Sequence, residues 1–98
     1  MPPADLIARL KDPALAMETL LSLDDLALVA RVKETAARDG LTAGAFAAQA
    51  IEHLAAHADD ETWLTLIGLM NGSADPGHVL LHRALRDAVS RSLDHTTA

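Results

Sequence analysis

The sequence predicts an all-α protein, a compact bundle of four to five short antiparallel helices. Alanine and leucine dominate a chain that is 50% apolar and holds a single phenylalanine and a single tryptophan. Both dominant residues favour helices, because alanine loses no side-chain entropy and leucine keeps its preferred rotamers. Apolar residues recur at helical spacing, whereas no stretch shows sustained two-residue alternation. The connections between these segments are short, which favours antiparallel neighbours.

The length and charge of the chain fit one small acidic domain. The 98 residues carry 14 acidic and 8 basic side chains, a net charge of −6. A domain of this size buries about two thirds of its unfolded surface, so the core is thin. We expect a single helical domain over residues 4–93 and a flexible C-terminal tail over residues 94–98.

Three helices are expected in the first forty residues. Asp12-Pro13 is typical of a helix start, since aspartate caps and proline suits the first turn. Ser22 and Asp25 form an approximate capping box for the next helix, which Gly40 ends. The expected helices span residues 4–11, 13–21 and 22–39.

The second half of the chain predicts further helices. Thr42 can cap one of them, and the acidic run 59–61 can open the next, where negative charge suits the helix dipole. The segment 63–70 is apolar on most sides, so we expect it to be the central element, with Gly68 at a close helix crossing. The last helix is expected to run from Asp75-Pro76 to about Leu93.

Four histidines form two pairs at four-residue spacing, His53 with His57 and His78 with His82. Residues four apart lie on one face of a helix, so two such helices can offer four imidazole nitrogens to one divalent metal ion. The sequence therefore predicts one candidate metal site, formed if the two helices face each other. Solvated histidines, or a histidine near a helix end that complements the dipole, explain the same spacing.

Catalysis and several classes of partner have little support in the sequence. The chain has no cysteine, which excludes disulfides and thiolate metal sites, and no serine lies in a nucleophile motif. We therefore expect no enzyme and no cofactor other than the possible divalent metal. The acidic balance argues against nucleic acid and anionic membranes. The N-terminus lacks the pattern of a signal peptide and no apolar run approaches roughly 20 residues, so a cytoplasmic protein is expected.

The section from Met17 to Leu54 resembles the ribbon-helix-helix DNA-binding family over about a third of the chain. A short apolar stretch, residues 17–23, is followed by a helix that ends at Gly40 and by a second helix. The resemblance implies a dimer with a strand near Leu20. The sequence departs from the family at that strand, which carries Glu18 and no lysine or arginine to read the major groove.

Three apolar residues fall away from the predicted core stripes of their helices: Leu28 in one, and Val79 and Leu80 in another. They either pack against the short N-terminal helices or form a binding surface. The leading hypothesis is a noncatalytic interaction or regulatory module that binds another protein or itself through these residues.

Overall fold

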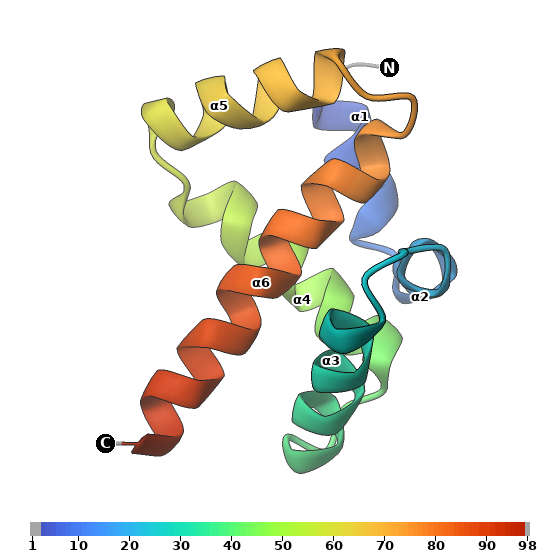
Figure 1. Cartoon of the computed structure of the whole chain (residues 1–98), viewed down its shortest axis with the longest axis vertical. Coiled ribbons are helices and arrows are strands. Elements are labelled where there is room, and N and C mark those ends of the chain that lie inside the picture. Colours follow the sequence, from blue (N-terminus) through green and yellow to red (C-terminus); the bar gives the residue numbers. More distant parts are fainter. Residues whose placement is uncertain (1–2, 98) are drawn as a thin grey trace.

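The computed structural model describes the backbone of residues 3–97 and the side chains of residues 4–92. The all-α class is confirmed, but six helices form in this part of the chain where four to five were predicted. They enclose one core within principal extents of 34 × 27 × 21 Å (Figure 1). The helices are α1 (Pro3–Leu10), α2 (Pro13–Leu21), α3 (Leu26–Arg38), α4 (Ala43–His57), α5 (Asp60–Asn71) and α6 (Pro76–Thr97).

Most helix starts are fixed by local capping. The side chains of Asp12, Thr42 and Asp59 accept hydrogen bonds from backbone N–H groups of the first turns of α2, α4 and α5, as predicted. The predicted start at Ser22 is wrong. Ser22 instead ends α2, and its hydroxyl donates to the carbonyl of Glu18. The N-cap of α3 is Asp25, whose Oδ1 accepts from Leu28 N–H at 3.1 Å.

The α6 helix is the centre of the molecule. It runs diagonally through the structure and packs against each of the other five helices (Figure 1). A wide arc of its side chains is buried because neighbours surround it on several sides. The α4 helix is the second central element and packs against α1, α2, α3 and α6. The buried apolar residues of α6 are Leu80, Leu81, Ala84, Leu85, Ala88 and Val89.

The prediction that the segment 63–70 is central is wrong. This segment belongs to α5, which lies across one end of α6 and packs mainly against that helix (Figure 1). Leu66 and Met70 are its buried residues, and the opposite face points outward. Gly68 lies on the outward face, where a Cβ atom would meet nothing within 4 Å. The close crossing expected at Gly68 is therefore absent.

The close helix approach occurs instead at Gly44, where α4 meets α2. A Cβ atom there would lie 2.5 Å from the carbonyl oxygen of Pro13 and 3.1 Å from Cβ of Met17. Only a residue without a side chain allows this contact. Gly40 ends α3 with φ +72, the left-handed conformation predicted for a glycine at that place.

Two further expectations differ from the structure, one at α2 and one at α6. Residues 13–21 are helical, so the strand near Leu20 that the ribbon-helix-helix resemblance implies is wrong. The α6 helix continues to Thr97, beyond the end predicted at Leu93. The side chains of the predicted tail, residues 94–98, lie outside the described part. Among the described residues, no helix has both the length and the apolar character needed to span a membrane.

Candidate functional site

The two histidine pairs have different local roles. His53 and His57 stack on α4 with ring centroids 4.1 Å apart, and Nδ1 of His57 donates to the carbonyl oxygen of His53 at 3.0 Å. On α6, Nδ1 of His78 lies 3.9 Å from a carboxylate oxygen of Asp75. Nε2 of His82 lies 3.1 Å from Oδ2 of Asp25. Each of the four imidazole rings therefore already contacts another group of the chain.

The structure does not bring the two histidine pairs together. Among the residues whose side chains are described, no three His, Asp, Glu or Cys side chains gather closely enough to hold a metal ion. His53 and His57 line a pocket between α4 and α6, whereas His78 and His82 line a groove beside α5. The four-residue spacing fixes the face of each helix but not which face of the neighbouring helix it meets.

The contact between Asp25 and His82 joins the start of α3 to α6. One oxygen of Asp25 caps α3 through Leu28 N–H, and the other contacts His82. The pKa of Asp25 is lowered from 3.8, first by the backbone hydrogen bond from Leu28 and then by the hydrogen bond with His82. Both contacts favour the ionised carboxylate, so this link is strongest when Asp25 is charged.

The substitution Asp25→Asn tests this link through its pH dependence. Asparagine keeps the cap but not the charge. Because the folded-state pKa is lowered, the contribution of the wild-type carboxylate is fully present above 3.8 and is lost as the pH falls through the folded value. We expect wild type to have the higher melting temperature near neutral pH and the difference to shrink in acid. Melting temperatures of the two proteins, measured from neutral pH to below pH 3.8, check this expectation. A difference in melting temperature that stays constant over these pH values would contradict it.

Two of the three residues predicted to form a binding surface are buried. Leu28 and Leu80 have exposed fractions of 7% and 0%, so the prediction that they lie outside the core is wrong. Val79 is partly buried and packs against the core. Leu28 and Leu80 therefore pack inside the molecule, and Leu80 does so because α6 is covered on more sides than its own pattern indicates.

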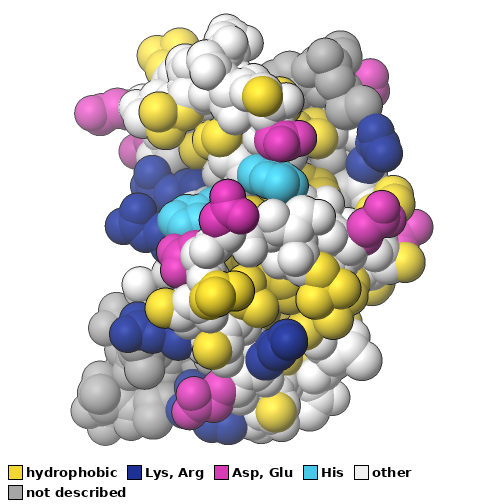
Figure 2. Space-filling model, turned by 45° about the vertical axis from the view of Figure 1, so that its right-hand side comes forward, with side chains coloured by type: hydrophobic (Ala, Val, Ile, Leu, Met, Phe, Trp, Pro, Cys, Tyr) yellow, Lys and Arg dark blue, Asp and Glu magenta, His cyan; other side chains and the backbone are white. Residues whose placement is uncertain are grey.

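The outward face of α5 is the exposed apolar surface that the sequence reasoning missed. Leu64 and Leu69 are 72% and 57% exposed, and Ile67 is 36% exposed. We call these three residues with Gly68 the α5 face. At the corresponding end of the molecule in Figure 2, several separate hydrophobic side chains are visible above a band of charged and histidine side chains. The signal was present in the sequence, since a short helix that is apolar on most sides cannot bury every side against one neighbour.

A groove of about 490 Å³ continues from the α5 face toward α3. Its apolar lining comes from Leu23, Leu66, Leu69 and Val79. Asp24 and Asp25 contribute negative charge to it, and Arg83 and Arg86 contribute positive charge. The groove thus extends the exposed apolar surface and gives it a charged border.

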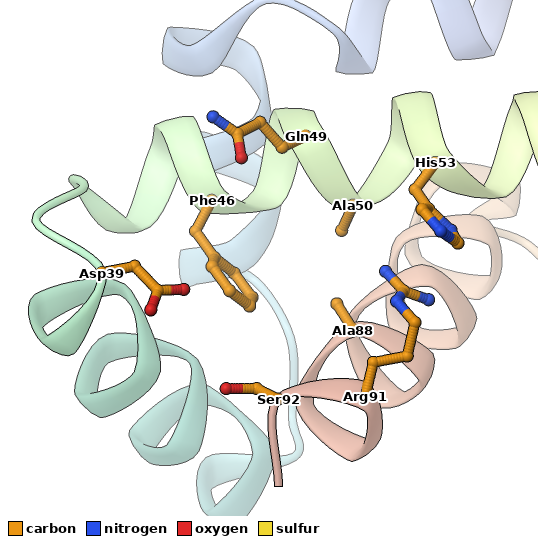
Figure 3. Close-up of a pocket in the computed structure, with 8 residues that line it drawn as sticks. All are labelled: Asp39, Phe46, Gln49, Ala50, His53, Ala88, Arg91 and Ser92. Atoms are coloured by element: carbon orange, nitrogen blue, oxygen red, sulfur yellow. The ribbon is translucent and has the colours of Figure 1, made fainter. Parts of the chain in front are cut away.

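A second pocket, of about 470 Å³, lies between the end of α3, α4 and the later part of α6. Figure 3 shows the ring of Phe46 pointing into it, with Ala50 and Ala88 between that ring and the pair His53 and Arg91. The remaining lining residues are Asp39, Gln49 and Ser92.

The pKa of His53 is lowered, first by desolvation and then by the charge of Arg91 and by His57, while Asp87 opposes the shift. A lowered pKa favours the neutral imidazole of His53, which can donate one hydrogen bond. The pocket therefore combines an apolar floor with polar groups at its ends. A scan against models of known families finds no match to this chain, and comparisons with curated proteins and with solved structures find none either.

Proposed function

We propose that this protein is a noncatalytic helical interaction module that associates with a second copy of itself through the α5 face. The observation that carries the proposal is the exposure of Leu64, Ile67 and Leu69 on one helix. Single exposed leucines are common on protein surfaces. These three residues lie around the outward side of α5, and exposed apolar residues close together can mark an interaction site.

The charge pattern of α5 favours a second copy as the occupant. Asp60 and Glu61 lie in the first turn, whereas the rest of the helix is uncharged. When two α5 helices pair antiparallel about a two-fold axis, each acidic end lies beside the uncharged end of the other helix. A parallel pair would bring the acidic ends together, so the antiparallel pair is favoured, and it has the closed symmetry of most homodimers.

The size of the surface sets the strength of the association. Three partly exposed side chains amount to roughly 300 Å² of apolar area, which is about the size of the largest apolar patch on a typical monomer. A standard interface buries about 800 Å² on each partner. The contact must therefore extend over the adjoining groove, and we expect a dimer of micromolar or weaker affinity.

Sedimentation of the untagged protein over a wide concentration range tests the proposal. The mass should rise with concentration from 10.3 kDa toward twice that value. The double variant Leu64→Asp and Leu69→Asp should stay monomeric, because dimerisation would bury two new charges on each chain. Leu21→Asp is the matched control, since Leu21 is 62% exposed but lies on α2, and it should leave dimerisation intact.

Cross-linking at Gly68 tests the geometry of the dimer. The chain has no cysteine, so Gly68→Cys introduces a single thiol on the outward face. Two helices that cross near this residue bring the two thiols within disulfide distance. We expect rapid formation of a covalent dimer on mild oxidation and much slower reaction for Leu21→Cys. Equal rates for the two variants, or a wild-type monomer at every concentration, would overturn the proposal.

A further inference from the structure

The pocket between α3, α4 and α6 carries opposite charges at its two ends. Asp39 lies at the end of α3, and Arg91 lies on α6 at the other side of Phe46 (Figure 3). Among the described residues, neither Asp39 nor Arg91 has a hydrogen bond or an ion pair through its side chain. Arg83, on the same face of α6, is instead paired with Asp87 at 3.0 Å.

The middle of the pocket is apolar and hollow because of its small side chains. Ala50 on α4 and Ala88 on α6 face each other there, and both are buried. Phe46 is only 7% exposed, so its ring is held in place by the core. A flat apolar group can contact the small part of this ring and of the two methyl groups that is exposed, so the apolar contribution to binding is small.

Arg91 and His53 suit a carboxylate, although the nearby Asp87, which pairs with Arg83, opposes it in part. The guanidinium of arginine offers several donors in a planar fork that matches a carboxylate. His53 lies next to Arg91 in Figure 3 and can donate a further hydrogen bond as a neutral imidazole. At the opposite end, the Asp39 carboxylate can accept hydrogen bonds from an ammonium group.

We propose that this pocket binds a small zwitterionic molecule, with its carboxylate at Arg91 and His53, its apolar centre against Phe46, and its ammonium group at Asp39. The ligand class is that of an amino acid whose two charged groups are separated by an apolar body. Both charged side chains are exposed to water, so hydration competes with each contact and the affinity is modest. This site does not depend on dimerisation through the α5 face, because it lies near the later part of α6.

Three related probes test the proposal by NMR titration of the full chain. The probe 4-(aminomethyl)benzoate carries both charges, 4-methylbenzoate carries the carboxylate alone, and 4-methylbenzylamine carries the amine alone. We expect the zwitterion to bind most tightly and to shift the amide signals of Phe46, Ala50 and Ala88. A bound carboxylate stabilises the imidazolium form, so both carboxylate probes should raise the pKa of His53, whose charged neighbours are Arg91, Asp87 and His57.

Two conservative variants test which residue binds each charged end of the ligand. Arg91→Gln should weaken binding of the zwitterion and of 4-methylbenzoate by about 5-fold, the upper end for a contact between exposed charges, and leave binding of 4-methylbenzylamine unchanged. Asp39→Asn should weaken binding of the zwitterion and of 4-methylbenzylamine by a similar factor and leave binding of 4-methylbenzoate unchanged. Arg9→Gln, at an exposed arginine of α1 outside this pocket, is the control and should leave binding of all three probes unchanged. The proposal is overturned if the three probes bind equally, if no lining residue responds, or if both pocket variants leave the zwitterion unaffected.

Discussion

Replacing Leu81 with alanine is expected to lower the free energy of unfolding by about 2–5 kcal/mol. Leu81 has no exposed surface and lies on α6, the helix that contacts all five others. Truncation removes apolar contacts and leaves a cavity that surrounding helices cannot close without moving. A domain of this length has a total stability of about 5–15 kcal/mol, so the loss is a large part of the whole. Chemical denaturation followed by circular dichroism measures it.

The same substitution at Leu64 on α5 is the matched control. Leu64 is 72% exposed, so alanine there removes little buried surface and should change stability by less than about 0.5 kcal/mol. Both variants should be measured at protein concentrations low enough to keep the chain monomeric, because association adds to apparent stability. Similar losses at Leu81 and Leu64 would contradict the assignment of α6 to the centre and α5 to the edge.

The contrast between α5 and α6 explains what the sequence could predict. Helix starts at Asp12, Thr42 and Asp59 depend on contacts within a few residues, so they can be read from local sequence. The position of each helix in the bundle depends on which helices cover it. The α5 helix contains more apolar residues than its single main neighbour can bury. This large number of apolar residues is why the sequence predicted a central helix there.

The candidate sites could not be predicted from the sequence either, because they too depend on which helices pack against each other. Helical spacing correctly placed His78 and His82 on one face of α6, but the partner they meet is Asp25, which is far away in the chain. Leu80 falls outside the apolar stripe of α6 and is nevertheless buried, because helices pack against α6 from several directions. Pairing of distant segments is a tertiary property, and one sequence carries no direct record of it.

Gly44→Ala is expected to destabilise the protein by about 1–3 kcal/mol, although alanine is the better helix former. The new methyl group would lie 2.5 Å from the carbonyl oxygen of Pro13, which is backbone and cannot rotate away. Relief requires α2 to move from α4, and Ala16 and Leu20 on α2 are fully buried. The steric penalty therefore exceeds the gain in helix propensity of about 1 kcal/mol. Thermal and chemical unfolding measure the net effect.

Gly68→Ala gives the opposite sign with the same chemical change. Gly68 lies in the interior of α5, and an added Cβ meets nothing within 4 Å. Only the helix propensity then acts, so stability should rise by about 0.5–1 kcal/mol in the monomer. A gain at Gly44 would mean that α2 and α4 are not in close contact, and a loss at Gly68 would mean that another element covers α5. The sign difference between the two glycines thus tests how both helices are placed, independently of any partner.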